Sequence, residues 1–221
     1  MSIAVKICGI TGPDAIDAAV NTGAAYGGLV FHPKSPRFIT FEQAAVLATR
    51  MRGRLKIVAL VADLDDDAIA ALVKTVRPDF LQLHGTETAK RVAEIRARFG
   101  VAVIKALPVA EVCDLDIVSD YEKVSDMLMF DARPPGGAER GGGHGLAFDW
   151  KILAGRSFAK PWFLAGGLNA ENVARAVELS GASHVDVSSG VESAPGVKDP
   201  VRIAAFINAT KSLAPLSRQS A

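Results

Sequence analysis

The stretch Trp162-Phe163-Leu164-Ala165-Gly166-Gly167-Leu168-Asn169 is a short apolar run that ends on a pair of glycines. A helical stretch, Ala170–Ser180, comes next, and a second short run, His184–Val187, then leads into Ser188-Ser189-Gly190. Short apolar runs without polar alternation are typical of strands that are covered on both faces of a parallel sheet. This stretch therefore predicts a strand, a helix and a parallel strand, with glycine-rich turns at the carboxyl ends of both strands.

The same alternation extends over the whole chain. Eight short apolar runs are predicted to be strands: Ile3–Cys8, Tyr26–Phe31, Lys56–Val61, Phe80–Leu83, Val101–Leu107, Met127–Phe130, Trp162–Ala165 and His184–Val187. Helical stretches lie between and after them: Asp14–Thr22, Phe41–Arg52 with Thr40 as N-cap, Asp65–Val76, Glu87–Arg98, Glu111–Val124, Phe148–Leu153, Ala170–Ser180 and Pro200–Lys211. Repeated strand–helix units imply right-handed crossovers and a single parallel sheet.

Eight units of about 28 residues are close to the minimum for a closed barrel, so we predict an α/β fold, the (β/α)8 or TIM barrel. An open, doubly wound sheet is the main alternative. It is disfavoured because the turn Gly9–Pro13 lacks the G-x-G-x-x-G pattern of dinucleotide sites. No linker interrupts the chain, so we predict one catalytic domain over residues 1–212 and a frayed tail over residues 213–221.

The 221 residues include 25 Lys and Arg against 24 Asp and Glu, which gives a net charge of +1. This balance does not predict nucleic acid or an anionic membrane as a partner. No apolar run reaches the roughly 18 residues of a membrane span, and the N-terminal residues show no signal-peptide pattern. The two cysteines, Cys8 and Cys113, cannot form a disulfide framework. We therefore expect a cytoplasmic protein, and a monomer because no exposed apolar helix stands out.

The carboxyl ends of the strands are the expected location of an active site, because they share one face of a parallel barrel. Cys8 ends the first strand, and Lys6 points to the same side since side chains alternate along a strand. A nearby cation lowers the pKa of a thiol and raises its thiolate fraction. Cys8 is therefore a candidate reactive thiol, and the competing interpretation is a small buried hydrophobic residue.

Asp131 follows the apolar run Met127–Phe130, and a carboxyl group at such a strand end can act as an acid. The competing interpretation is a cap of the following turn. Strand parity also places Gln82 beside His84 on one face of the fourth strand, so polar groups are expected in the upper barrel. These polar groups belong either to a structural network in which every group has a hydrogen-bond partner or to a reaction centre.

The loop after the second strand is stiffened by Pro33 and Pro36 and presents Arg37. A guanidinium matches a carboxylate through two parallel hydrogen bonds, which makes Arg37 a candidate for binding a carboxylate. A solvated surface charge is the commoner fate of an arginine in a loop, and it remains the alternative here.

Two turns predict an anion site, Gly166-Gly167 after the seventh strand and Ser189-Gly190 after the eighth. Backbone N–H groups near a helix N-terminus bind phosphate without net positive charge, and phosphate sites recur at this place in the barrel. The alternative is glycines that serve tight turns only. The glycine run Gly141–Gly145 resembles a mobile lid. No His, Cys, Asp or Glu cluster has metal-ligand spacing, so we predict no metal.

Seven segments follow one another in the order of a known family: Lys6-Ile7-Cys8-Gly9-Ile10-Thr11, Phe31 with Ser35-Pro36-Arg37, Gln82-Leu83-His84-Gly85, Phe130-Asp131, Gly142-Gly143-His144-Gly145 before Phe148-Asp149-Trp150, Leu164-Ala165-Gly166-Gly167-Leu168, and Val185-Asp186-Val187-Ser188-Ser189-Gly190-Val191-Glu192. Together they resemble the phosphoribosylanthranilate isomerases, over nearly the whole chain. The family often has Ser, Thr or Asn at the position of His144.

The resemblance implies an enzyme of tryptophan biosynthesis that rearranges N-(5′-phosphoribosyl)anthranilate to 1-(2-carboxyphenylamino)-1-deoxyribulose 5-phosphate, an Amadori rearrangement. It implies Asp131 as general acid and Cys8, as thiolate, as general base. Neither a cofactor nor a metal is implied, and the partner is a small phosphorylated substrate. The substrate-binding residues implied are Arg37 for the anthranilate carboxylate, the backbone at Gly166, Gly167, Ser189 and Gly190 for the phosphate, and His84, Gly143, Gly145, Asp186 and Ser188.

Two other functions remain open from the residues alone. One is another sugar-phosphate barrel enzyme: a related isomerase of histidine biosynthesis, which would have a carboxylate in place of Cys8, or a pentose-phosphate epimerase, which would bind a metal. The other is a barrel that binds a phosphorylated ligand without turning it over.

Overall fold

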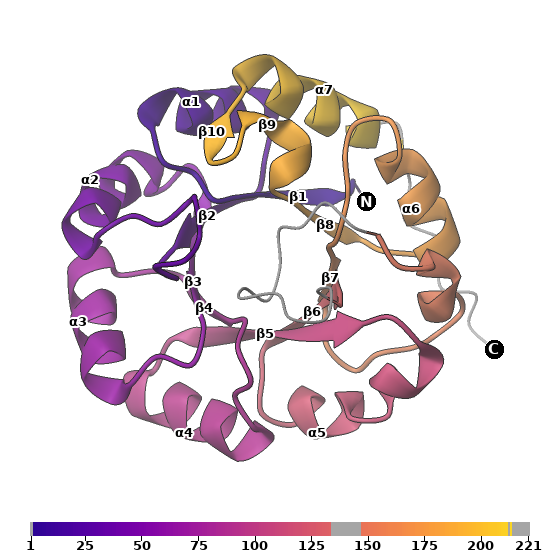
Figure 1. Cartoon of the computed structure of the whole chain (residues 1–221), viewed down its shortest axis with the longest axis horizontal. Helices are drawn as coiled ribbons and strands as arrows, with labels where there is room; N and C mark the ends of the chain where they lie inside the picture. The colour runs from indigo at the N-terminus through magenta and orange to yellow at the C-terminus, as the bar shows by residue number, and fades with distance from the viewer. Residues whose placement is uncertain (1, 134–146, 212, 214–221) are drawn as a thin grey trace.

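Eight parallel strands close into a barrel in the computed structural model, which describes residues 2–133, 147–211 and 213 (Figure 1). Each strand is hydrogen-bonded to the next along the chain, and the last is bonded to the first, with Lys6 opposite Asp186. The closed sheet confirms the predicted single-domain TIM barrel. The strands are β1 (Ala4–Cys8), β2 (Tyr26–Val30), β3 (Lys56–Val61), β4 (Phe80–Leu83), β5 (Ala102–Val109), β6 (Met127–Ala132), β7 (Trp162–Leu164) and β8 (His184–Val187).

Helices form a ring around the outside of the barrel (Figure 1). Thr40 caps the second helix: its side chain accepts the N–H of Gln43, whose own side chain accepts the N–H of Thr40. Within the described ranges, none of the helices is long and apolar enough to cross a membrane. The helices are α1 (Pro13–Thr22), α2 (Phe41–Met51), α3 (Asp66–Val76), α4 (Ala89–Phe99), α5 (Val118–Glu122), α6 (Val173–Ser180), α7 (Pro200–Lys211), and the 3-10 turns η1 (Val112–Leu115), η2 (Trp150–Leu153) and η3 (Ser189–Val191).

The first and last helices complete the ring, because α7 packs against α1 (Figure 1). Of the tail predicted to be frayed, Leu213 is described: its backbone N–H donates to Thr210 O at 3.2 Å, and its side chain packs against the core. Residues 214–221 lie outside the described residues.

The segment predicted as one helix over Glu111–Val124 is instead the turn η1 followed by the short helix α5. The carboxylate of Asp114 accepts the backbone N–H groups of Ala110 and Glu111 at 2.8 and 2.9 Å. These bonds cap the N-terminus of η1, which ends at Leu115, and α5 begins separately at Val118, so the prediction of one continuous helix was wrong.

The helix α6 begins at Val173, three residues after the predicted start at Ala170. The side chain of Asn169 accepts the N–H groups of Glu171 and Asn172, and the side chain of Asn172 accepts the N–H of Asn169 at 2.8 Å. These reciprocal bonds hold the residues before α6 in a turn. The predicted helix over Phe148–Leu153 is likewise reduced to η2.

The protein has two apolar cores, one between the barrel and the helices and one inside the barrel. Tyr26 and Phe163 meet edge to face inside, with ring centroids 5.1 Å apart, near the amino-terminal ends of their strands. The inner core fills the lower barrel, so the polar inward residues lie nearer the carboxyl ends of the strands. The buried residues of the inner core are Val58, Ile104, Ala106, Met127, Met129, Phe163 and Ala165.

A small antiparallel hairpin, β9 (Glu192–Ala194) with β10 (Val197–Lys198), follows η3 and was not predicted. Gly196 in its turn has a φ of 82°, and a Cβ there would lie 2.4 Å from the carbonyl oxygen of Pro36. The hairpin therefore packs directly on the loop that carries Arg37, and only glycine allows this approach.

Candidate active site

Cys8 lies buried at the carboxyl end of β1, directly beside the glycine of the neighbouring strand. Gly28 on β2 pairs with Cys8, and a Cβ on Gly28 would lie 3.2 Å from both Cys8 Sγ and Lys6 Cε. The Nζ of Lys6, which is fully buried, donates to Asp186 Oδ1 at 2.7 Å. Strand parity thus predicted correctly that Lys6 and Cys8 share a face, while the room for them depends on Gly28.

The pKa of Cys8 is raised above its ordinary value, because burial of the thiol outweighs the lowering effect of the Lys6 charge. Burial also acts to lower the pKa of Lys6, but the charge of Asp186 and the hydrogen bonds to Asp186 and Cys8 raise it above its ordinary value. Lys6 is therefore a charged ammonium group at neutral pH, whereas Cys8 is mainly a neutral thiol. The predicted effect of Lys6 on the thiol is present, but it does not set the direction of the shift.

We expect alkylation of Cys8 to be slow at neutral pH and to accelerate about tenfold per pH unit, because only the thiolate reacts. The rate should still be rising at about pH 8.5, where an ordinary cysteine is half ionised. The measurement is iodoacetamide labelling read by mass spectrometry, with the Cys113→Ser variant as background because Cys113 is exposed. A rate that no longer changes with pH above neutrality would show a lowered pKa and contradict this expectation.

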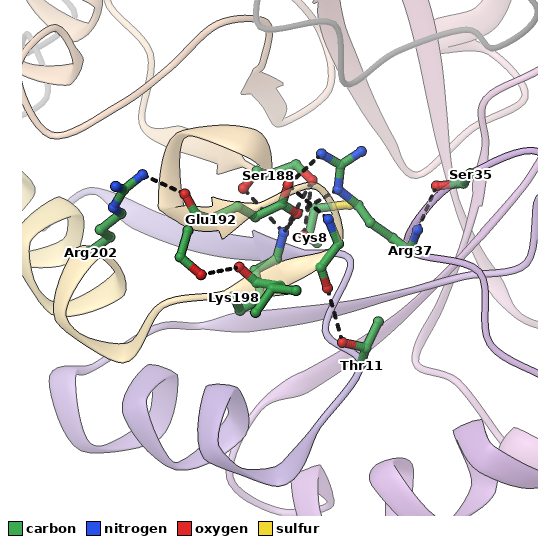
Figure 2. Close-up of polar contacts among 11 residues, drawn as sticks. Cys8, Thr11, Ser35, Arg37, Ser188, Glu192, Lys198 and Arg202 are labelled. Carbon is green, nitrogen blue, oxygen red and sulfur yellow. Dashed lines mark hydrogen bonds and ion pairs between the residues drawn. The ribbon is translucent and has the colours of Figure 1, made fainter.

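Arg37 is buried, with 5% of its surface exposed, and is not the solvated surface charge that remained an alternative. Its Nε donates to Glu192 Oε1 at 2.6 Å and its Nη2 to Glu192 Oε2 at 2.8 Å (Figure 2). Its aliphatic stem passes over Gly9, since a Cβ there would lie 2.4 Å from Arg37 Cδ. Arg37 is therefore held beside Cys8 by a bidentate ion pair from the hairpin.

The contact of Glu192 with Arg37 is a feature of the site that the sequence did not reveal. Glu192 lies in the segment Val185–Glu192, but nothing in its spacing indicates that it meets Arg37, 155 positions away. Burial raises the pKa of Glu192, but the hydrogen bonds from Arg37 and Lys198 hold it below its ordinary value. Glu192 is therefore ionised at neutral pH.

Lys198 connects the hairpin to the backbone next to Cys8 (Figure 2). Its Nζ donates to Glu192 Oε1 and, at 3.1 Å, to the carbonyl oxygen of Ser188, while Ser188 Oγ donates to the carbonyl oxygen of Cys8 at 3.1 Å. Burial lowers the pKa of Lys198, although the charge of Glu192 opposes this. Lys198 is therefore a second cation whose charge acts on Cys8, and Ser188 links the backbone after β8 to the end of β1.

Asp131 is the last residue but one of β6, and it contacts His84, which directly follows β4. The His84 Nε2 lies 3.2 Å from Asp131 Oδ2, and Asp131 Oδ1 accepts the backbone N–H of Ala132 at 2.8 Å. Gln82 Nε2 lies 2.8 Å from His84 Nδ1. Gln82 and His84, which strand parity predicted on one face, are therefore in direct contact, and His84 reaches Asp131 across β5.

The turns after β7 and β8 pack against each other. Gly166 and Gly167 have φ values of 88° and 63°, which favour glycine. A Cβ on Gly190 would lie 2.0 Å from the carbonyl oxygen of Leu168, so no larger residue fits there. The structure thus brings together Gly166, Gly167, Ser189 and Gly190, whereas Gly143, His144 and Gly145 lie outside the described residues.

A buried ion pair fastens the loop that follows His84. Lys105 Nζ on β5 donates to Glu87 Oε2 at 2.7 Å and to the carbonyl oxygen of Gly85 at 2.8 Å. Asp63 adds a second contact, because its Oδ1 accepts the N–H of Thr86 at 2.8 Å. His84 is therefore carried by a backbone that is held from two sides.

The sequence is similar to those of known proteins over nearly its whole length. The sequence model of the family described as "N-(5'phosphoribosyl)anthranilate (PRA) isomerase" matches residues 5–209. The chain is 54% identical to an N-(5'-phosphoribosyl)anthranilate isomerase of Paracoccus denitrificans over 207 residues, 94% of this chain and 96% of that protein. It is 51% identical to that of Cereibacter sphaeroides over 209 residues, 95% of this chain and 99% of that protein.

Solved structures agree as well. The phosphoribosyl anthranilate isomerase of Thermotoga maritima has a TM-score of 0.85 and 34% identity, covering 96% of this chain and 100% of that chain. A phosphoribosyl anthranilate isomerase in complex with reduced 1-(o-carboxyphenylamino)-1-deoxyribulose 5-phosphate has a TM-score of 0.80 and 30% identity, with coverage of 96% and 100%. With matches that span both partners almost end to end, this chain belongs to the N-(5'-phosphoribosyl)anthranilate isomerase family, whose members are enzymes of tryptophan biosynthesis.

Proposed function

We propose that this protein converts N-(5′-phosphoribosyl)anthranilate into 1-(2-carboxyphenylamino)-1-deoxyribulose 5-phosphate. The observation that carries the proposal is the burial of Cys8 and Asp131 at the same end of one closed barrel. Around the barrel, the glycine turns after β7 and β8 lie between the ends of β6 and β1. A carboxylate-binding arginine, a thiol, an anion site and a carboxyl group thus surround one end, as a substrate with a carboxylate and a phosphate requires.

The chemistry needs an acid and a base. Asp131 would give a proton to the ring oxygen of the ribose, so that the bond between this oxygen and C1′ breaks and the nitrogen lone pair forms a protonated Schiff base. Cys8, as thiolate, would then remove the proton from C2′, and the electron pair of that C–H bond would neutralise the nitrogen. The resulting enolamine tautomerises to the ketone. The nitrogen of the substrate accepts the electrons, so this route needs no organic cofactor.

Lys6 supports the base in this scheme. Its ammonium group is charged, is anchored by Asp186 at 2.7 Å, and acts on the sulfur of Cys8 by charge and hydrogen bonding. Since burial keeps most of the thiol protonated, a fixed cation next to the sulfur stabilises the thiolate fraction that reacts. We therefore propose a positioning role for Asp186, through Lys6, in addition to the substrate contact that the family resemblance implies.

The carboxylate and the phosphate of the substrate would each be bound at a separate site, on either side of the reacting carbon. Arg37 would bind the anthranilate carboxylate with the edge formed by Nη1 and Nη2, because the edge formed by Nε and Nη2 already pairs with Glu192. The backbone at Gly166, Gly167, Ser189 and Gly190 would bind the phosphate. Contacts at both ends would hold C2′ against Cys8. His84, Ser188, Gly143 and Gly145 stay proposed substrate contacts, and the cytoplasmic location and monomeric state stay predictions.

Replacing Arg37 with alanine should raise KM by roughly ten- to a hundredfold, the range for losing a hydrogen bond to a charged group, with a smaller change in kcat. Glu192→Gln should shift KM in the same direction, because the guanidinium loses its anchor. The measurement is steady-state kinetics, with Arg175→Ala as a control since Arg175 is exposed and pairs only with Glu178 on its own helix among the described residues. Unchanged KM and kcat in Arg37→Ala would remove Arg37 from the site.

The test of the function is loss of the fluorescence of the anthranilate-type substrate in the presence of the purified protein. The wild-type protein should turn the substrate over, and Asp131→Asn should bind it but reduce kcat by roughly 10²–10⁴-fold. Binding without turnover by the wild-type protein would instead favour a ligand-binding barrel. Activity that a chelator abolishes would favour the metal-dependent epimerase alternative.

A further inference from the structure

Three side chains form a chain of contacts that ends on the proposed acid: Gln82, His84 and Asp131. Gln82 is fully buried, and His84 and Asp131 have side chains that are 12% and 11% exposed. The strand β5 lies between β4 and β6, and its residue Ala106, which pairs with Met129, has a small side chain inside the barrel. The long side chains from β4 can therefore reach across β5 to those of β6.

The orientation of the Gln82 amide follows from its neighbours. Gln82 Nε2 lies 2.8 Å from His84 Nδ1 and 3.2 Å from Met129 Sδ, which are both acceptors toward an N–H donor. In this orientation both hydrogens of the amide nitrogen have an acceptor. The reversed amide would place the oxygen against the sulfur, where no donor exists, and would leave the nitrogen where Oε1 now lies. Met129 therefore decides which end of the amide faces His84.

Gln82 lowers the stability of the inner core at this position. Among the described residues, no group donates to its buried Oε1. A buried polar atom without a partner destabilises the fold, and an apolar side chain of similar volume would avoid this penalty. Stability of the inner core therefore does not explain the glutamine, whereas its contact with His84 does.

From this geometry we infer that Gln82 is a positioning residue: it holds His84 in the tautomer with the proton on Nε2, so that His84 donates to Asp131 Oδ2. The inference rests on the proposed function for its meaning in catalysis. Because the amide donates to Nδ1, this nitrogen carries no proton, and the neutral ring must be protonated on Nε2. Asp131 then receives one N–H from His84 and one from the backbone of Ala132. Both donors stabilise the carboxylate that remains after Asp131 has given its proton to the substrate.

The tautomer can be measured without substrate. In the wild-type protein labelled with ¹⁵N-histidine, Nε2 of His84 should have the chemical shift of a protonated ring nitrogen and Nδ1 that of an unprotonated one; the His84→Asn variant assigns the signals. In Gln82→Glu the carboxylate can only accept from Nδ1, so the proton should move to Nδ1 or the ring should become doubly protonated. A wild-type His84 with its proton on Nδ1 would overturn the inference, whatever the variants do.

Kinetics provides the second readout. Gln82→Met should lower kcat by roughly ten- to a hundredfold with little change in KM, the range for weakening a hydrogen bond to a charged group. The same substitution should have no further effect in the His84→Asn background, because the two residues act in one chain. Met127→Leu, a change in the same inner core without a polar contact to Gln82, should leave kcat and the His84 signals unchanged. Wild-type kcat in Gln82→Met would contradict the inference while leaving the proposed function intact; absence of turnover in the wild-type protein would contradict the function alone.

Discussion

Cys8→Ser should reduce kcat by roughly 10²–10⁴-fold while KM changes little. Serine keeps the size of the side chain and the contacts at Gly28, but its hydroxyl is a far weaker acid than a thiol. Lys6 cannot stabilise an appreciable alkoxide fraction, so the group that would remove the C2′ proton is lost. The measurement is steady-state turnover by fluorescence.

The matched control is Cys113→Ser, since Cys113 is exposed in η1. This variant should retain the activity of the wild-type protein and should still lose it on alkylation of Cys8. If Cys8→Ser turned over substrate at a near-wild-type rate, Cys8 would not be the base, and the carboxylates near it would have to be considered instead.

Lys105→Met should lower the free energy of unfolding by about 3–5 kcal/mol, because it leaves Glu87 as a buried charge without its partner. The side chains of Lys105 and Glu87 are each only 3% exposed, and their ion pair fastens the loop after His84. For a chain of this size the loss corresponds to a decrease in Tm of roughly 10 °C. Urea unfolding followed by circular dichroism measures it.

The exposed ion pair of Lys90 with Glu94 is the control for the buried pair of Lys105 with Glu87. Lys90 and Glu94 lie on the surface of α4, 87% and 53% exposed, so Lys90→Met should change the free energy of unfolding by less than about 1 kcal/mol. The double variant with Glu87→Leu and Lys105→Met should be more stable than Lys105→Met alone, because no buried charge remains. A Lys105→Met protein as stable as the wild type would show that Glu87 is solvated or protonated instead.

Local patterns were sufficient for much of the architecture. The runs that became β1 to β8 are each predicted from a few consecutive residues, since strands buried on both faces must be apolar throughout. The strand-end position of Cys8 and Asp131 follows from the same runs. The segment Glu111–Val124 shows the limit of this reasoning, because its apolar spacing predicts one helix where the structure has the turn η1 and the short helix α5.

Long-range contacts decided the rest of the site. Glu192 meets Arg37 only because a hairpin folds back over the loop of Arg37, and Gly28 makes room for Cys8 only because β2 lies beside β1.

The sequence by itself predicted the barrel and the face on which Cys8 and Asp131 lie, because alternation along a strand is a property of neighbouring residues. The roles of Cys8 and Asp131 as base and acid come from the family resemblance and stay proposals. Only the tertiary structure decided the direction of the Cys8 pKa shift, the anchor of Arg37 and the contact of Gln82 with His84. Burial and ion pairing are sums over side chains brought together from distant strands, and no short stretch of the chain contains them.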